Sequence, residues 1–421
     1  MKKQCEISLI LLLAGLLGTA AAAQRPSRIS LKDAIRLALR HNHALIAAAG
    51  NIGQAQAEEI TANLRPNPQL TADALYVPIF SPSHFSTNYL NNTQEFDIGV
   101  SYLWERGNKR QHRLAAAKTQ TAVVRESYLD ARRGLIYAVG QQFVAALLAK
   151  SSLQFARRDL ASFQRTLQIS QARYQAGEIS EGDYLKIQLQ QLQFQTDVSN
   201  AELAWAQARA GLRALLGENT LARHFTIVGH LRYVPITLGR AGLEALALKQ
   251  RPDYLAALDG IPAAQAQYGL AKADAKQDVT EGMQYTHTGG VNEAGFTFNI
   301  GIPIFDRNQG EILRTRLAIG QARQAADAVG DQVLADVRTA WATVHSAAQV
   351  VKIYQTGYLQ EARSSRDISA YAYQHGAVSL LNFLDAERSY RNVQLSYRQA
   401  LANALLAREQ MFDAVGTRKL P

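Results

Sequence analysis

The chain has 421 residues and a formal net charge of +10. Its Lys and Arg residues are scattered along segments rich in Gln, Ala and Glu, without a basic stripe or interleaved aromatic residues. This arrangement favours a solvated helix surface over nucleic-acid binding. Cys5 is the only cysteine, which excludes disulfides and cysteine metal ligands from the rest of the chain.

The first 23 residues have the pattern of a secretory signal. Lys2 and Lys3 give a positive start, Leu9–Leu17 give an apolar run, and Ala21–Ala23 give a small-residue cleavage site. The apolar run is too short for a transmembrane helix. We expect 1–23 to be a signal peptide and the mature chain to be periplasmic, secreted or inserted as a β-barrel, whose alternating strands score weakly in hydropathy.

A first structural repeat is expected over 24–217. Its first helix begins after Ser30, a good capping residue, and ends before Pro66. Alternating apolar residues then predict strands close to the ~9–11 residues of a tilted membrane strand, and a proline-free run predicts a helix roughly 100 Å long. The expected elements are a helix at 31–65, strands at 66–80 and 95–104, a helix at 107–174 and a returning helix at 181–216.

The rest of the chain repeats this plan. A connector is expected at 218–239, at mid-height of the helices, followed by a second structural repeat at 240–416 and a C-terminal tail at 417–421. The expected elements of the second repeat are a helix at 240–277, interrupted near Pro252, strands at 279–288 and 294–305, a helix at 308–373, a turn at 374–379 and a helix at 380–415.

The duplication is visible at the expected turns. Tyr174-Gln175-Ala176-Gly177 recurs 199 residues later as Tyr373-Gln374-His375-Gly376. A period of this length is too long for a solenoid of short repeats. It indicates instead a duplicated unit of the kind that closes a symmetric assembly.

The strands and helices of one chain are incomplete by themselves. About four strands cannot close a sheet, and open strand edges are not tolerated in lipid. Three chains would supply twelve strands, an even number within the bacterial range. The expected fold is therefore mainly α with a membrane β-barrel contribution: a trimeric twelve-stranded barrel continued by a long α-helical coiled-coil barrel. The alternative is a monomeric helical periplasmic protein with small sheets packed on its helices.

The residues at the strand-to-helix junctions resemble a known family. The duplicated plan and the Tyr-x-x-Gly motif are similar to those of the TolC-like outer-membrane efflux proteins. Two segments resemble the heavy-metal cation efflux branch of that family. They are Ile302-Pro303-Ile304-Phe305-Asp306-Arg307-Asn308-Gln309-Gly310 and Leu103-Trp104-Glu105-Arg106-Gly107-Asn108-Lys109-Arg110.

This resemblance implies a homotrimer in the outer membrane of a Gram-negative bacterium, with a helical tunnel through the periplasm. Its implied partners are a periplasmic adaptor and an inner-membrane, proton-driven pump of the resistance-nodulation-division type. Metal cations or small toxic molecules would pass through it passively, without a cofactor and without enzymatic chemistry. Two alternatives stay open: a soluble periplasmic coiled-coil adaptor and a type I protein secretion channel.

The resemblance also assigns roles to residues at the two turns. Asp183 and Tyr373 match a hydrogen-bonded pair that closes the periplasmic tip, and Asn382 and Asp385 match positions of the gate that face the lumen. A ring of Asp385 would favour cations, although Asp183 and Asp385 are also ordinary first-turn helix residues. The turns themselves are expected to dock the adaptor through Tyr174, Gly177, Ser180, Gly376 and Ser379.

Other polar residues give no sign of a catalytic or metal site. His41 and His43 lack a third ligand at suitable spacing, and His84, His287 and His375 are isolated in the sequence. The chain has neither a Gly-rich phosphate loop nor a Gly-x-Ser-x-Gly elbow. The sequence therefore predicts neither an enzyme nor a resident metal site.

Overall fold

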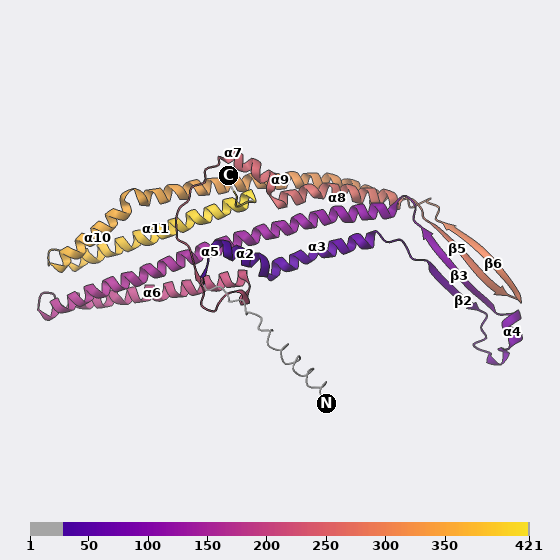
Figure 1. Ribbon diagram of the computed structural model, residues 1–421, viewed down its shortest axis with the longest axis horizontal. Helices are drawn as coiled ribbons and strands as arrows, with labels where there is room; N and C mark the ends of the chain where they lie inside the picture. Colours follow the sequence, from indigo (N-terminus) through magenta and orange to yellow (C-terminus); the bar gives the residue numbers. More distant parts are fainter. Residues whose placement is uncertain (1–27, 420–421) are drawn as a thin grey trace, which may run out of the picture. The chain divides into compact units, whose positions relative to one another are not determined.

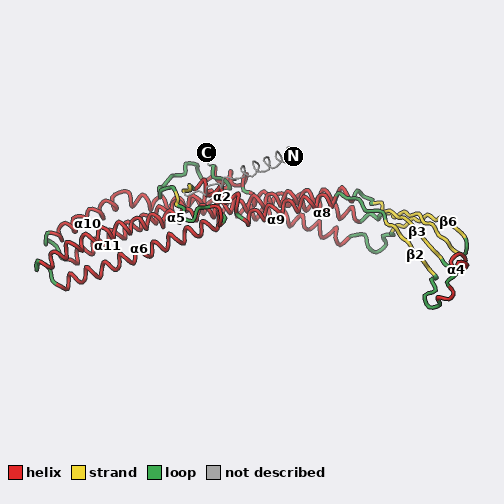
Figure 2. The backbone as a smooth tube through the Cα atoms, turned by 60° about the horizontal axis from the view of Figure 1, so that its bottom comes forward, coloured by secondary structure: helices red, strands yellow, loops and turns green. Residues whose placement is uncertain are grey.

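The computed structural model describes residues 28–419, so the predicted signal peptide lies outside the described residues. The chain forms two compact units, and Figures 1 and 2 show the helices and strands that compose them. Each unit takes segments from both repeats, because the long helices begin in one unit and end in the other. The two repeats are therefore not two separate globular domains.

The first unit contains residues up to His43, Gly134–Thr237 and Ala340–Met411. It is built from helices and one short parallel pair of strands. Its elements are β1 (Arg28–Ile29), α2 (Leu31–His41), part of α5 (Lys109–Gln175), α6 (Glu181–Leu216), the single 3₁₀ turn η2 (Glu218–Thr220), β4 (Thr226–Ile227), part of α9 (Gln309–Ile353), the π-helical turn η3 (Tyr354–Tyr358), α10 (Leu359–Gln374) and most of α11 (Leu380–Val415).

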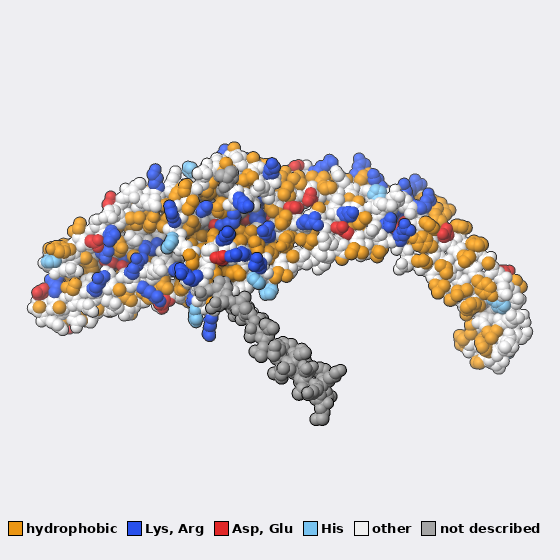
Figure 3. All heavy atoms as spheres, viewed as in Figure 1, with side chains coloured by type: hydrophobic (Ala, Val, Ile, Leu, Met, Phe, Trp, Pro, Cys, Tyr) orange, Lys and Arg blue, Asp and Glu red, His pale blue; other side chains and the backbone are white. Residues whose placement is uncertain are grey.

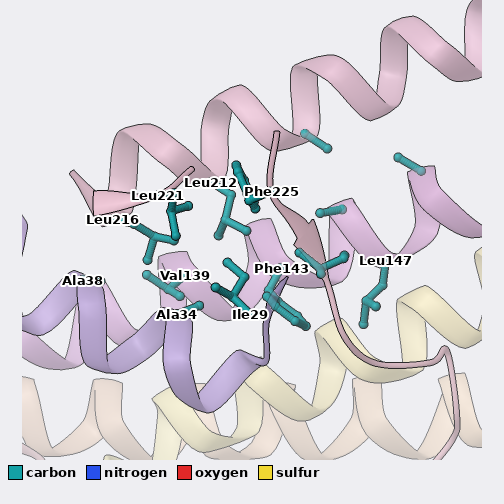
Figure 4. Packing of buried hydrophobic residues seen from close by; sticks show 14 residues of the cluster. Ile29, Ala34, Ala38, Val139, Phe143, Leu147, Leu212, Leu216, Leu221 and Phe225 are labelled. Atoms are coloured by element: carbon teal, nitrogen blue, oxygen red, sulfur yellow. The ribbon is translucent and has the colours of Figure 1, made fainter. Parts of the chain in front are cut away.

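A hydrophobic core holds this unit together where α2, α5 and α6 meet. Figure 4 shows Ile29, Val139 and Leu212 among its side chains, and none of the three exposes any surface. The strand pair β1–β4 carries Ile29 and Ile227 into the same cluster. The predicted connector at 218–239 therefore contributes to this core through β4.

The second unit contains Ala44–Arg133, Leu238–Thr339 and Phe412 onward. Its four strands form an antiparallel sheet in the order β2-β3-β5-β6, so that the repeats contribute two strands each. Its elements are α3 (His43–Ala62), β2 (Gln69–Leu75), η1 (Pro82–His84), α4 (Thr87–Asn92), β3 (Glu95–Trp104), the first part of α5, α7 (Arg240–Gln250), α8 (Pro252–Asp274), β5 (Val279–Thr288), β6 (Val291–Ile300) and the first part of α9.

Several expected boundaries differ from the structure. The predicted helix 31–65 is two helices, because Asn42 has an extended backbone and its side-chain amide donates to the Leu215 carbonyl at 3.0 Å. The predicted helix 308–373 is interrupted by the π-helical turn η3, in which Gly357 has a φ of 151°. The predicted strand 294–305 is also wrong at its end, since β6 stops at Ile300.

Among the described residues, none of the helices combines the length and the hydropathy that crossing a membrane requires.

Candidate functional sites at the hairpin turns and the sheet

The two helical hairpins of the first unit end in the same kind of turn. After α5, the Glu178 amide donates to the Arg173 carbonyl at 2.9 Å and the Gly177 amide donates to the Tyr174 carbonyl at 3.0 Å. The α10–α11 turn repeats this pair of bonds 199 residues later. Both are Schellman motifs, which need a left-handed residue after the helix, and Gly177 and Gly376 supply it with φ values of 76° and 75°.

The helices that leave these turns also begin alike. The Ser180 hydroxyl accepts a bond from the Asp183 amide at 3.1 Å, and the Ser379 hydroxyl accepts one from the Asn382 amide at 3.3 Å. Asp183 and Asn382 therefore occupy equivalent positions in the first turns of α6 and α11. The ring of Tyr174 stacks on Tyr184 with centroids 5.1 Å apart and so supports the first turn from the side.

A hydrophobic cluster joins the two hairpins near these turns. Phe163 stacks on Phe194 with centroids 4.4 Å apart, and Tyr373 stacks on Phe383 at 5.3 Å. The buried members of the cluster, which come from α5, α6, α10 and α11, are Phe163, Ile187, Phe194, Tyr373, Leu380 and Phe383.

The sheet of the second unit has one apolar and one polar face. Side chains alternate between the two faces along each strand, and the antiparallel register keeps the apolar residues of all four strands together. The apolar face carries Leu70, Ala72, Ala74, Phe96, Ile98, Val100, Tyr102, Trp104, Val279, Met283, Tyr285, Ala294, Phe296, Phe298 and Ile300, with Glu281, His287 and Asn292 as polar exceptions.

The apolar face is exposed within the chain. Phe296 and Phe298 keep 73% and 76% of their surface accessible. Hydrophobic side chains gather over the strands in Figure 3, with Lys and Arg over the adjoining helix ends. Full burial of one large apolar side chain is favourable by about 1.5–3 kcal/mol. Because the chain itself leaves this face exposed, a partner outside the chain would have to bury it.

Comparison with known proteins identifies the chain. The family described as outer membrane efflux protein matches residues 34–218 and 243–417, one match for each repeat. The chain belongs to this family. The resemblance expected from the junction motifs is therefore confirmed, and so is the mainly helical fold with a contribution from strands. A soluble periplasmic adaptor, one of the two alternatives, is ruled out.

Individual relatives cover nearly the whole chain. The cobalt-zinc-cadmium resistance protein CzcC of Cupriavidus metallidurans is 25% identical over 90% of this chain and 88% of its own. The pyoverdine export outer membrane protein OpmQ of Pseudomonas putida is 24% identical over 92% and 85%. The crystal structure of the Campylobacter jejuni CmeC outer membrane channel covers 92% of this chain and 85% of its own at 16% identity, with a TM-score of 0.76.

In this outer-membrane efflux protein, Asp183 and Tyr373 do not bond to each other. The Tyr373 hydroxyl lies 3.4 Å from the Ser170 hydroxyl, and the Asp183 carboxylate lies 3.3 Å from the Lys186 ammonium. Within the chain, the ring of Tyr373 lies in the hydrophobic cluster, where it is 4% exposed, whereas Asp183 lies at the exposed end of α6. The pairing of Asp183 with Tyr373 at the tip of an assembly stays a prediction.

Arg173 makes the polar connection between the hairpins instead. Its guanidinium donates to the Tyr373 carbonyl at 2.7 Å and to Glu178 at 3.0 Å, and it lies over the Tyr373 ring at 5.5 Å. Sequence reasoning missed this residue. The available signal was the repeat itself, because the position equivalent to Arg173 is Ala372, so the charge is specific to one turn.

Asp385 is exposed but has a cation beside it. Its carboxylate lies 3.8 Å from the guanidinium of Arg388, one turn later on α11, and both side chains are more than two-thirds exposed. Lys186 stands in the same relation to Asp183. The acidic positions expected at the tip are therefore partly neutralised by their own helices, which weakens the cation preference that a bare ring of Asp385 would have.

A buried cluster of charged groups lies further along the same four helices. Asp159 on α5 and Glu387 on α11 are 6% and 7% exposed. Arg391 pairs with Asp159 at 2.8 Å and also contacts Asp197 on α6. Arg366 on α10 also faces the cluster, since its positive charge lowers the pKa of both buried carboxyls.

Burial shifts the titration of these carboxyls. Removal from water raises the pKa of Glu387 to about 7, and the neighbouring Asp159 adds to this rise. Burial also raises the pKa of Asp159, against the opposing effect of Arg391. Removal from water disfavours the charged form of a carboxyl, so this cluster holds a proton close to neutral pH. No local pattern in the sequence indicates this cluster, because its groups come from four separate helices.

Within residues 28–419, no three side chains of His, Cys, Asp or Glu come close enough to hold a metal ion. His287 lies 2.7 Å from the Asn292 side-chain oxygen and 3.0 Å from the Asn91 carbonyl. His375 lies 2.9 Å from the Tyr371 carbonyl. Both rings therefore have hydrogen-bonding partners within the chain.

Proposed function

We propose that three copies of this chain form one passive export duct across the outer membrane and into the periplasm. The observation that carries the proposal is the two-faced sheet with its unpartnered edges at β2 and β6. Joining β6 of one copy to β2 of the next would pair the backbone groups of both edges. Twelve strands would then turn the apolar face to lipid and the polar face to the lumen.

The helices would form the tunnel and its periplasmic tip. Asp183, Tyr373, Asn382 and Asp385 are proposed to line or close the tip. The turn residues Tyr174, Gly177, Ser180, Gly376 and Ser379 are proposed to dock a periplasmic adaptor, which links the duct to an inner-membrane pump of the resistance-nodulation-division type. The pump would supply the energy, and the duct itself would carry out no chemistry.

Metal cations are the proposed cargo, with small toxic molecules as the second candidate. The name of CzcC supports the first class, and the name of OpmQ, at nearly equal identity, supports the second. The junction residues Phe305-Asp306-Arg307-Asn308 favour the metal branch. The partly neutralised tip does not require a cation, so the cargo is expected to be selected by the pump.

Gene deletion would test the cargo directly. A strain that lacks this chain should lose resistance to cobalt, zinc and cadmium salts and regain it when the intact gene is restored. Unchanged metal resistance together with loss of an exported siderophore would place the chain with the small-molecule exporters instead. Native mass spectrometry of the detergent-extracted protein tests the assembly, for which we expect three copies.

A further inference from the structure

The apolar face of the sheet continues past its last paired residue. In β6 the even-numbered residues are apolar from Ala294 to Ile300, whereas the odd-numbered positions hold Glu293, Gly295, Thr297 and Asn299. After the strand ends at Ile300, the loop carries two further apolar residues, Ile302 and Ile304. They are 79% and 62% exposed, and the adjoining Phe305 is 88% exposed.

The loop that carries these side chains satisfies much of its own backbone. The Ile304 amide donates to the Ile302 carbonyl at 2.9 Å. The Arg307 guanidinium donates to the Pro303 carbonyl at 3.2 Å, and the Gln309 amide group donates to the Phe305 carbonyl at 3.1 Å. Unpaired backbone groups are costly at the edge of a bilayer, so this pairing suits a segment that leaves water.

The first repeat treats the equivalent segment differently. There β3 continues to Trp104, which is paired with Val279 of β5. In both repeats the next helix begins after an Asn with φ 57°, Asn108 or Asn308. Only in the second repeat, therefore, does an apolar loop outside the sheet connect the strand to the next helix. This loop lies at the border of the sheet that is proposed to face the membrane.

We propose that Gly301–Phe305 is an interfacial anchor that inserts into the phospholipid leaflet on the helix side of the outer membrane. This inference rests on the outer-membrane placement of the sheet. Apolar side chains held by a paired backbone enter the headgroup region to a depth of about 5–10 Å. Arg307, an exposed residue after Asp306, brings a guanidinium that suits the lipid phosphates.

A second copy of the chain is the main alternative occupant, and the strand geometry argues against it. Neighbouring copies would pair through backbone groups in the plane of the sheet. The last residue of β6 in the ladder is Ile300, so Ile302 and Ile304 lie beyond the backbone groups through which neighbouring copies would pair. Closing the sheet would therefore not cover them.

Spin labels test the proposal on the full chain in a Cys5→Ser background, since Cys5 is the only native cysteine. The protein is reconstituted in phosphatidylethanolamine–phosphatidylglycerol vesicles, with one label at Phe305→Cys. Phe298→Cys serves as the lipid-facing control and Ile368→Cys, 69% exposed on α10, as the aqueous control. We expect the ratio of oxygen to nickel-chelate accessibility at Phe305→Cys to be severalfold higher than at Ile368→Cys and lower than at Phe298→Cys.

Two outcomes at Phe305→Cys would overturn the anchor. A ratio equal to that of Ile368→Cys would place the loop in water. Low accessibility to both reagents would mean that another copy covers it. An aqueous ratio at Phe298→Cys as well would overturn the proposed channel together with the anchor, so the two failures are distinguishable.

A loss-of-contact variant gives a second measurement. Replacing Ile302, Ile304 and Phe305 together by Ser should lower the fraction of protein that floats with vesicles severalfold, with unchanged helix content. The matched control replaces two exposed leucines of α9 by Ser, Leu313 and Leu317, which are 56% and 66% exposed. This control should bind vesicles like the native chain. Equal losses in both variants would contradict the anchor.

Discussion

At the scale of single residues, Arg173 makes a polar contact between the two hairpins close to their turns. Its side chain is 15% exposed, and one guanidinium reaches the carbonyl of the opposite turn, the ring beside it and Glu178 of its own turn. Hydrogen bonds to charged groups contribute about 1.5–3 kcal/mol each. If the tip acts as the proposed gate, a contact of this moderate strength would let it open.

Replacing Arg173 by Gln should therefore loosen the tip more than Tyr373→Phe does. The hydroxyl contact of Tyr373 is long at 3.4 Å, so its removal should cost less than about 1 kcal/mol. Single-channel conductance at rest should rise for Arg173→Gln and stay near the native value for Tyr373→Phe. Arg363→Gln, an exposed arginine on α10 that pairs within its own helix, is the matched control. A larger rise for Tyr373→Phe would restore the tyrosine hydroxyl as the lock.

Gly177 offers a purely conformational test at the turn. A Cβ built there meets nothing within 4 Å, so Gly177→Ala should act only through its positive φ, at a cost of about 1–2 kcal/mol. Hydrogen exchange of the turn amides should accelerate roughly 5–30-fold. Gly182→Ala, inside the first turn of α6, should not accelerate exchange, because alanine favours a helix over glycine. Equal exchange rates in both variants would mean that the turn tolerates a side chain.

The sequence predicted the turns well and their contacts poorly. A glycine after a helix and a serine before the next one act within a few residues, so Gly177, Ser180, Gly376 and Ser379 were recognisable from the sequence alone. Partners across hairpins depend on how the helices pack. Within the chain, Tyr373 lies against Ser170 and Phe383, which no local pattern indicates, and its pairing with Asp183 in an assembly stays a prediction.

At the scale of elements, the packing of four helices creates the buried carboxyls. Asp159, Asp197 and Glu387 lie close to the arginines Arg366 and Arg391. Burial, with the neighbouring charge of Asp159 as a smaller cause, raises the pKa of Glu387 to about 7. The association of α5 and α11 is thereby linked to pH.

The sign of this linkage follows from the two protonation states. When the helices separate, Glu387 returns toward its ordinary pKa of 4.5 and releases its proton. Between these two values only the packed state holds the proton, so packing weakens as the pH rises toward 7 and stays constant above it. The full difference is about 3 kcal/mol. Hydrogen exchange of α11 near Glu387, corrected for intrinsic rates, should show this loss of protection.

Glu387→Gln should remove the pH dependence of the hydrogen-exchange protection of α11, because the glutamine side chain is neutral at every pH. Glu202→Gln makes the same change at a half-exposed residue of α6 and should behave like the native chain. A profile of Glu387→Gln that still weakens between pH 5 and 7 would assign the linkage to other groups.

The element boundaries that the sequence missed have tertiary causes. Asn42 is unremarkable in a helical sequence until its side chain meets the end of α6. Gly357 is tolerated in many helices, but here it takes a φ of 151° inside a π-helical turn. The end of β6 at Ile300 was hidden because the apolar alternation continues into the loop.

At the scale of the whole molecule, the duplication distributes each repeat over both compact units. Each repeat contributes two strands to one sheet and one helical hairpin to the other unit. The pattern of strands and helices was therefore predictable from local periodicity. The division into units was not, because the long helices α5 and α9 begin in one unit and end in the other.

The two faces of the sheet lead to a paired prediction for the assembled protein. Phe298→Lys places a charge on the apolar face, where it should cost about 2–4 kcal/mol near the middle of a bilayer. Thr297→Lys places the same charge on the polar face, opposite Gly282, which leaves room for it. Fractionation of outer membranes should recover far less assembled protein for Phe298→Lys and a native amount for Thr297→Lys. The reverse result would mean that the sheet turns its other face to lipid, and equal recovery would mean that neither face meets the bilayer.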